Sequence, residues 1–392
     1  MSAEAKKKKV SQILDEETGS KSYQAHKYSL DEDYLMDYGD SSASGFVWKR
    51  GGETDPPRKY KDLSEQAVLY AKRGEQSLTY FLDGSRHVYK VEDRAYPNGS
   101  RTLVYPTIAG QVAVGICKRK DKLMAREELH REFAISVPDK ADANIKAGFY
   151  EALRDKLNAS KELERILERG WKFSTPVTYD TKIDKRRFED RGTARIQDIM
   201  VDREKAMVKK LVRAGKLDQN NYLVKDGSLE YRMRAEEQDK DRSFLSFKQN
   251  YNWVIGLSKK FNAEACFEKG KSNPGYIADL PLYSRTAVAY FAAEKEPLTF
   301  AVWYVRIRAE DKTRSPFDGI LKVEKILALT EEVNGGMNTD TVDMLSAHII
   351  NERNPTCYGS DVRWANHIYP IYLTECFIKS QYLSSESFLH LF

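Results

Sequence analysis

The sequence predicts one mixed α/β domain that follows a polar N-terminal extension. Alternating apolar and polar residues run from about residue 77 to 120, and a helical period replaces them from 124 to about 215. Further strand-like runs then precede a helical C-terminal part. Strands, then helices, then strands and a terminal helix are typical of one mixed sheet with flanking helices.

The extension covers residues 1–60, which are polar, charged and poor in periodic apolar residues. This composition predicts a partly flexible segment. Within it, "YLMDY" and "FVWKR" are candidate anchors on the body of the domain. The folded domain is then expected at residues 61–392, with a helical insertion at about 124–215.

The individual elements follow from local patterns. Gly, Pro and Asn separate "SLTYFLDGS", "RHVYKVEDR", "RTLVYPTIAG" and "QVAVGICKRK", which predicts consecutive strands of an antiparallel meander. Helices are predicted in "MAREELHREFAI", in "IKAGFYEALRDKLNASKELERILERGW", and in "TARIQDIMVDREKAMVKKLVRAG", which ends at Gly215. Later strands are expected in "NYLVKDGSL", "NWVIGLSKKF", "LTFAVWYVRIRA" and "GILKVEKIL", and C-terminal helices in "TVDMLSAHIINERN" and "YPIYLTECFIKSQYL".

Composition excludes several classes of protein. The longest apolar runs of this 392-residue chain, such as "TFAVWYVRI", are too short to span a membrane, and no signal-peptide pattern opens it, so we expect a cytoplasmic protein. Its four cysteines form no CxxC pair, which favours free thiols over a zinc site. The net charge of +5 permits nucleic-acid binding without indicating it.

Asp-Gly-Ser follows an apolar run twice, at Asp83 and at Asp226. A carboxylate where a strand meets a Gly turn lies at the edge of a sheet, where α/β proteins commonly carry their sites. For each copy alone, the alternative is a turn aspartate that bonds its own backbone. Because the two copies have matched contexts, we weigh one shared site equally with two separate turns.

Glu204 lies between the two copies, in the last predicted helix. At 100° per residue, Met200 and Val208 fall about 40° to either side of it and Leu211 about 20° away. Glu204 is therefore the charged residue in the middle of the apolar face. A buried carboxylate costs several kcal/mol unless it is paired with a basic side chain or binds a cation, and both alternatives stay open.

Two aspartates and a glutamate form an all-oxygen environment that suits Mg²⁺ or Mn²⁺ better than zinc. Such clusters serve the hydrolysis of phosphodiesters, in which paired ions activate water and neutralise the leaving oxyanion. The same ligands can also hold one structural ion.

Taken together, these stretches resemble the NurA family of nucleases, which have an RNase H-like core. The resemblance spans about residues 77–380 and implies an RNase H-like mixed sheet with flanking helices, and a metal-dependent DNA exo- or endonuclease. It rests on five stretches in the same order: "FLDGSRHVYKV", "RIQDIMVDREKAMVKKL", "YLVKDGSLEYR", "WVIGLSKKF", and "GILKVEKIL" with "YPIYLTECF".

The family resemblance also implies roles for single residues. The two Asp-Gly-Ser aspartates and a helical glutamate of the family bind Mn²⁺ or Mg²⁺, which implies Asp83, Asp226 and Glu204 here, with two ions expected. Lys259 of "GLSKK" matches the family's Ser-Lys and is a candidate phosphate contact, with a solvated strand-end lysine as the alternative. Tyr369 of "YPIYL" matches a tyrosine of the site, with core packing as the alternative.

One departure from the family pattern concerns a histidine. Cys376 and Phe377 stand where the family has Ala-His. Neither His367 nor His348 has the spacing to replace that histidine, although either can approach in space. Glu375 is a candidate substitute ligand or base.

The resemblance further implies partners. The family forms homodimers and works with a HerA-type hexameric ATPase that pumps duplex DNA, in DNA end processing or antiphage defence. This chain has no Walker A motif, so an external motor is expected. The basic stretches "DKRRFEDRGTAR" and "ICKRKDKLMAR" are candidate phosphate contacts, with a solvated surface as the alternative. Two other functions remain open: a weakly active or inactive subunit that scaffolds or regulates the motor, and an RNase H-like enzyme that acts on RNA or hybrids.

Overall fold

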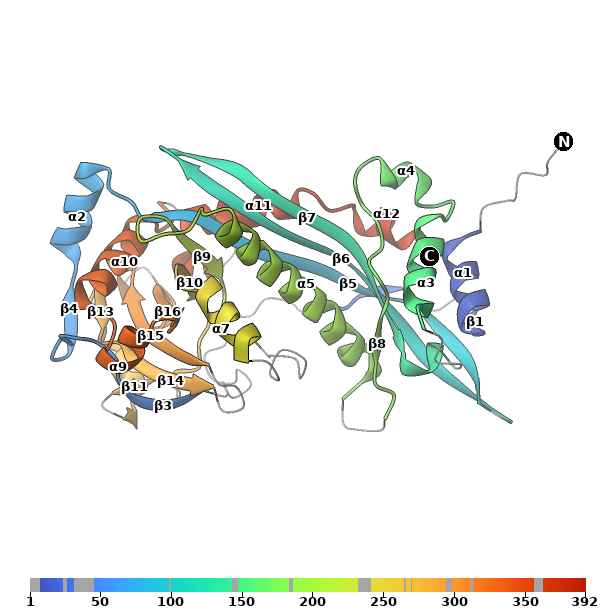
Figure 1. Ribbon diagram of the computed structural model, residues 1–392, viewed down its shortest axis with the longest axis horizontal. Coiled ribbons are helices and arrows are strands. Elements are labelled where there is room, and N and C mark those ends of the chain that lie inside the picture. Colours follow the sequence, from blue (N-terminus) through green and yellow to red (C-terminus); the bar gives the residue numbers. More distant parts are fainter. Residues whose placement is uncertain are drawn as a thin grey trace.

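The computed structural model of the chain describes most of its residues, namely 8–23, 27–31, 46–98, 100–142, 147–182, 186–231, 241–263, 266–268, 270–293, 298–310, 313–355 and 362–392. The molecule is elongated, and three long strands run through its middle (Figure 1). No helix in these ranges is both long and apolar enough to cross a bilayer.

The main sheet has the strand order β3-β14-β15-β16-β10-β9-β5-β6-β7-β8. These strands are β3 (Phe46–Gly51), β5 (Leu78–Asn98), β6 (Arg101–Lys120), β7 (Leu123–Pro138), β8 (Val177–Tyr179), β9 (Tyr222–Asp226), β10 (Val254–Ser258), β14 (Ala289–Ala293), β15 (Thr299–Arg306) and β16 (Ile320–Ile326). Off this path, β1 (Lys21–Tyr23) and β2 (Tyr28–Ser29) pair with β5, and β4 (Tyr60–Asp62) pairs with β13 (Ser284–Thr286), which in turn pairs with β15. A separate hairpin joins β11 (Phe267–Glu268) and β12 (Lys271–Ser272).

The helices are α1 (Val10–Thr18), α2 (Ser64–Arg73), α3 (Phe149–Asn158), α4 (Glu164–Leu167), α5 (Phe188–Arg213), α7 (Asp241–Asn250), α8 (Pro274–Ala278), α9 (Thr330–Gly335), α10 (Thr339–Asn351), α11 (Tyr369–Lys379) and α12 (Ser385–Leu389). As predicted, α5 ends just before Gly215, whose φ of 64° lies in the left-handed region that ends many helices.

The strands β5, β6 and β7 form an antiparallel meander. On the other side of β5, β9 pairs parallel to β5 and β10 pairs parallel to β9. The helix α5 connects β8 to β9. The predicted fold class, a mixed α/β fold with one large mixed sheet and flanking helices, is therefore confirmed.

Two element predictions are wrong. The four short strands expected at 77–120 are two long strands, β5 and β6, which pair along nearly their whole length. The helix predicted in "MAREELHREFAI" is part of β7, which pairs with β6. Three of its glutamates form ion pairs with basic side chains in α5 or just after it: Glu127 with Lys216, Glu128 with Lys210, and Glu132 with Arg203.

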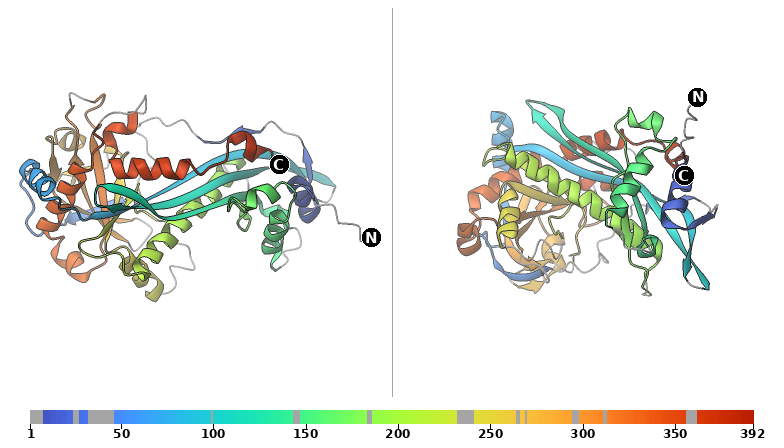
Figure 2. Two further views of the ribbon diagram at one scale, coloured as in Figure 1. Left: turned by 90° about the horizontal axis from the view of Figure 1, so that it is seen from above. Right: turned by 45° about the vertical axis from the view of Figure 1, so that its right-hand side comes forward.

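Two layers of helix cover opposite faces of the long strands. Viewed from above, α11 lies on one side of β5 and β6, and α5 lies on the other side (Figure 2). The α5 layer encloses one apolar core that includes Leu82, Val114 and Met200. A second core that includes Phe81 and Val224 contains buried apolar residues of α10 and Ile371 of α11.

Much of the described N-terminal region packs on the body. Val10 and Leu14 of α1 are fully buried in a third core at the far end of the strands, where α3 and α12 also lie (Figure 1). The predicted anchor "FVWKR" is confirmed, because it forms β3 and pairs with β14. The other anchor, "YLMDY", lies outside the described residues, and the domain boundary near residue 60 stays a prediction.

Candidate metal site

The two Asp-Gly-Ser stretches lie side by side because their strands are parallel neighbours. In the β5–β9 pairing, Phe81 is opposite Val224 and Leu82 is opposite Lys225. One residue further along both strands, this register brings Asp83 beside Asp226. The two matched stretches therefore form one location in the fold, although a long stretch of sequence separates them.

The two stretches differ in backbone. The second one ends its strand as expected, since β9 stops at Asp226 and Gly227 has a φ of 86°. The first is not a turn: Asp83 and Gly84 lie within the continuous strand β5. Here the glycine provides space rather than backbone freedom, because a Cβ at Gly84 would lie 2.5 Å from Oε1 of Glu204.

Glu375 is the third carboxylate of the group. Oxygen atoms of Asp83, Asp226 and Glu375 lie within 4.8 Å of one another. Glu375 reaches them from α11, which packs closely on the strands because Gly115, the partner of Asp83 in β6, has no side chain to hold it away. A Cβ at Gly115 would lie 2.9 Å from Cγ1 of Ile378, one turn further along α11.

Lys259 places a cation within this group. Its Nζ donates to Oδ2 of Asp226 at 2.7 Å, lies 2.8 Å from Nε2 of His367, and lies 4.0 Å from Oε2 of Glu375. The backbone of Lys259 is fixed as well, because Nδ2 of Asn366 donates to its carbonyl oxygen at 2.8 Å. Lys259 is therefore a site lysine, and the alternative of a solvated strand-end lysine is wrong.

His367 approaches the group in space, as the sequence allowed. Its Nε2 lies 3.2 Å from Oε2 of Glu375, and its Nδ1 lies 3.2 Å from the carbonyl oxygen of Ile368. The side chain is almost fully buried at the start of α11. His348 lies elsewhere, stacked on Tyr70 with 4.8 Å between the ring centroids. A histidine thus adjoins the carboxylates even though Phe377 occupies the family's histidine position.

The electrostatics of the group follow from burial and from its mixed charges. Burial and the neighbouring charge of Asp226 raise the pKa of Asp83 well above its ordinary value. Burial opposes ionisation of Glu375 as well, but the hydrogen bond with His367 and the charge of Lys259 outweigh it and lower the pKa of Glu375. For Lys259, burial is outweighed by the charges of Asp226, Glu375 and Asp83, so its pKa is raised.

Glu204 is not among the three carboxylates whose oxygens lie within 4.8 Å of one another, and its predicted role as a metal ligand stays untested. The helical wheel correctly predicted that Glu204 is buried, since this residue is only 2% exposed. However, α5 faces the side of β5 to which Gly84 belongs, and successive strand residues point to opposite faces. Its Oε2 lies 3.2 Å from Nζ of Lys225, so the alternative of a buried ion pair describes it.

Lys225 and Glu324 hold the second Asp-Gly-Ser turn in place. Nζ of Lys225 donates to the carbonyl oxygens of Asp226, at 2.9 Å, and Ser228, at 3.3 Å. Oε2 of Glu324 accepts hydrogen bonds from Oγ of Ser228 and from the backbone N–H of Leu229, both at 2.7 Å. Neither residue was predicted, because a lysine or glutamate inside a strand gives no local sign of a turn that it supports.

Tyr369 lies at the surface. Its side chain is 43% exposed, and its ring stacks on Tyr372 with 6.3 Å between the centroids. The Tyr372 ring in turn contacts His367 edge-on at 6.1 Å. The alternative of core packing is therefore wrong for Tyr369, and its predicted role in catalysis stays untested.

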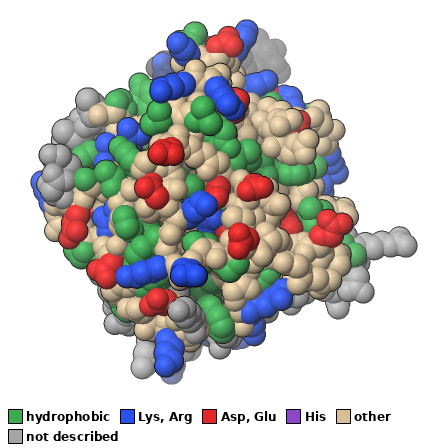
Figure 3. Space-filling view, turned by 90° about the vertical axis from the view of Figure 1, so that its left-hand side faces the viewer, with side chains coloured by type: hydrophobic (Ala, Val, Ile, Leu, Met, Phe, Trp, Pro, Cys, Tyr) green, Lys and Arg blue, Asp and Glu red, His purple; other side chains and the backbone are tan. Residues whose placement is uncertain are grey.

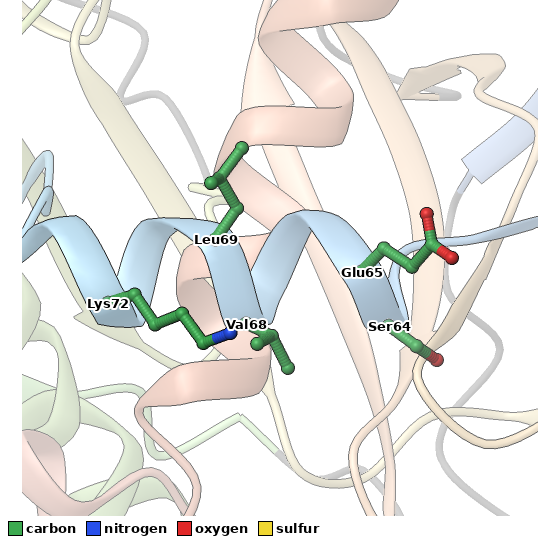
Figure 4. Close-up of a pocket in the computed structure, with 5 residues that line it drawn as sticks. All are labelled: Ser64, Glu65, Val68, Leu69 and Lys72. Carbon is green, nitrogen blue, oxygen red and sulfur yellow. The ribbon is translucent and has the colours of Figure 1, made fainter.

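A separate pocket of about 410 Å³ lies along α2, away from the carboxylates. Its lining residues are Ser64, Glu65, Val68, Leu69 and Lys72. Their side chains fan out along one helix and do not converge on a point (Figure 4). Viewed from this end, basic and acidic side chains are interspersed among the described residues (Figure 3). Neither feature resembles a chemical site, so the carboxylate group is the better candidate.

Comparison with known proteins leaves the family open. No family model matches the sequence, and none of the curated proteins matches it. The fold is similar to the crystal structure of the NurA nuclease from Sulfolobus solfataricus, with a TM-score of 0.37 and 9% sequence identity over 84% of this chain and 90% of that chain. Similarity at this level carries no argument about function, which must rest on the geometry of the site.

Proposed function

We propose that this protein is a divalent-metal-dependent nuclease that hydrolyses phosphodiester bonds of DNA. One observation carries the proposal: three carboxylates from two parallel strands and a covering helix have oxygens within 4.8 Å of one another, with the ammonium group of Lys259 among them. Buried like charges at this spacing are costly unless cations balance them.

The residues fit Mg²⁺ or Mn²⁺. The donors are all carboxylate oxygens, which these hard ions prefer. Two oxygens that share an Mg²⁺ at about 2.0–2.1 Å are at most about 4.2 Å apart. At most one pair of the three oxygens can be trans, and cis oxygens of an octahedral ion are only about 2.9 Å apart. The observed spread of up to 4.8 Å therefore requires the carboxylates to close by up to about 1.9 Å around the ion. Asp83, Asp226 and Glu375 would hold the ion, which supplies a Lewis acid for the phosphate and lowers the pKa of a bound water.

The chain's own residues supply the remaining functions. Hydrolysis joins a water oxygen to phosphorus, breaks one P–O ester bond, and moves a proton from the water to the departing oxygen. Lys259 offers a fixed positive charge for a phosphate oxygen in the transition state. Exposed Arg126, whose guanidinium lies over the Phe377 ring at 5.8 Å, is a candidate contact for the substrate backbone beside α11.

The scaffold alternative has less support. Its main argument is the missing family histidine, and His367 already adjoins Glu375 and Lys259 from another position. The HerA-type motor, the homodimer and the DNA specificity remain predictions from the family resemblance.

Cleavage of end-labelled linear DNA with Mn²⁺ or Mg²⁺ tests the proposal, with RNA and RNA–DNA hybrid as parallel substrates. We expect cleavage of DNA that is abolished by EDTA and reduced at least 100-fold by Asp83→Asn, Asp226→Asn or Glu375→Gln. Asp198→Asn is the matched control, because its carboxylate lies on the surface of α5 and is 51% exposed. Cleavage that survives all three site substitutions would overturn the proposed site.

If the wild-type chain cleaves none of these substrates alone, the assay is repeated with a HerA-type ATPase and ATP. A stable complex that still cleaves nothing would favour the scaffold. Preference for RNA or the hybrid would favour the third alternative.

A further inference from the structure

We propose that the site binds one divalent cation per chain and that the ammonium group of Lys259 occupies the position of a second ion. This inference rests on the proposed function, because it concerns the ion that the same carboxylates would hold. The proposed single ion differs from the two ions that the family resemblance implies.

The first argument is positional. Nζ of Lys259 lies 2.7 Å from Oδ2 of Asp226 and 4.0 Å from Oε2 of Glu375, so it bridges two of the three carboxylates. A two-metal site holds its ions about 3.5–4 Å apart, so a second ion would lie within this same group of carboxylates. A carboxylate has two oxygens, so Asp226 can hold the lysine with one and the metal ion with the other.

The second argument is rigidity. Lysine is usually a mobile point charge on a flexible stem. Here its head group contacts Asp226, His367 and Glu375, and its backbone carbonyl accepts from Asn366. Its side chain is only 13% exposed. The contacts fix the ammonium group in place, as a metal site fixes an ion.

The third argument is charge. The three ionised carboxylates carry three negative charges, which Lys259 and one divalent ion balance. A second divalent ion would leave two excess positive charges in a buried group, which is costly. Lys379 also pairs with Glu375, but its side chain is 45% exposed and water screens its charge. Glu204 and Lys225 balance each other on the opposite face.

Counting bound Mn²⁺ tests the inference without requiring catalysis. The whole chain is titrated with Mn²⁺, and bound ion is measured by isothermal calorimetry and by loss of the free-Mn²⁺ paramagnetic resonance signal. We expect about one Mn²⁺ per wild-type chain and none in Asp226→Asn. Lys259→Met should bind about two, because it vacates a cation position, whereas Lys259→Arg should bind one. Lys210→Met is the control and should bind one, because its ion pair lies on the surface.

The outcomes separate the two proposals. Two ions in the wild-type chain would overturn the role of Lys259 and leave the nuclease proposal standing. If the wild-type chain binds no Mn²⁺, the metal site and this inference are both overturned. A single ion in folded Lys259→Met would also overturn the inference. The wild-type count requires no variant to fold, so it decides the stoichiometry in every case.

Discussion

Oε2 of Glu204 lies 3.2 Å from Nζ of Lys225, and both side chains are buried on the α5 face of the sheet. The same Nζ donates to the carbonyl oxygen of Asp226. Glu204 thus acts on the carboxylate group through Lys225 and the second Asp-Gly-Ser turn, so we assign it a positioning role rather than a place among the metal ligands.

Removal of one partner of this pair should be strongly destabilising. Glu204→Leu leaves the buried charge of Lys225 uncompensated and should lower the free energy of unfolding by about 3–5 kcal/mol. The double variant Glu204→Leu/Lys225→Met should recover most of that loss, because an apolar pair replaces the ion pair. Urea denaturation measures both. Glu16→Leu, which breaks an exposed pair with Lys8, should change stability by less than about 1 kcal/mol. A double variant no more stable than Glu204→Leu would contradict the pairing.

Metal-dependent stabilisation should separate ligands from the positioning residue. A ligand present at about 100 times its dissociation constant adds about 2.7 kcal/mol to the stability of the folded state. Mn²⁺ should therefore raise the melting temperature of the wild-type chain and of Glu204→Gln, and chelation should reverse the rise. Glu375→Gln should lose most of the effect. Equal losses in Glu375→Gln and Glu204→Gln would show that the two residues have been assigned wrongly.

The glycine of the first Asp-Gly-Ser should be required for packing. A Cβ at Gly84 would lie 2.5 Å from Oε1 of Glu204 and 3.1 Å from Cγ of Met200. Gly84→Ala should therefore cost about 1–3 kcal/mol through overpacking against α5. Gly51→Ala in β3 is the control, because no atom lies within 4 Å of its added Cβ and no loss is expected. Equal stability of the two variants in denaturant titrations would contradict this account.

The sequence located the aspartates well because their signal is local. Asp83 and Asp226 each follow an apolar strand, and parallel pairing of two such strands suffices to bring them together. The sequence also predicted the burial of Glu204, because a helical wheel reports which side of a helix is apolar. It does not report which face of the sheet the helix covers, and that choice separates Glu204 from the aspartates.

The rest of the site depends on contacts between distant segments. Glu375 and His367 reach the aspartates only because α11 packs on the face of β5 and β6 opposite α5. The length of β5 was missed for a similar reason: Gly84 indicates a turn locally, but pairing with β6 on one side and β9 on the other keeps the strand extended. Tertiary packing overrode the local pattern in both cases.

The N-terminal helix should contribute to stability despite its place in a polar extension. Leu14 of α1 is fully buried against the far end of the long strands, so Leu14→Ala should lower the free energy of unfolding by about 2–5 kcal/mol. Leu69→Ala is the control: its side chain is 43% exposed on α2, and its loss should be below about 1 kcal/mol. If Leu14→Ala and the wild type have the same free energy of unfolding in urea denaturation, α1 is detached in solution.

His348 should make the folded state sensitive to acid. Burial and the charge of Arg119 lower its pKa from 6.5 to about 4. Between these values the unfolded chain binds a proton that the folded chain does not, so the free energy of unfolding falls as the pH is lowered through this window. At pH 4.5 the loss from this residue should be about 2–3 kcal/mol relative to pH 7.

His348→Gln isolates this contribution. Glu352 also lies in this region, and burial raises its pKa. As the pH falls, protonation of Glu352 therefore raises the free energy of unfolding, which is opposite to the effect of His348. Because both proteins contain Glu352, its effect cancels when the variant is compared with the wild type. Urea denaturation between pH 4.5 and 7.5 should give a flatter stability curve for His348→Gln. Parallel curves would mean that His348 is not kept neutral in the folded chain.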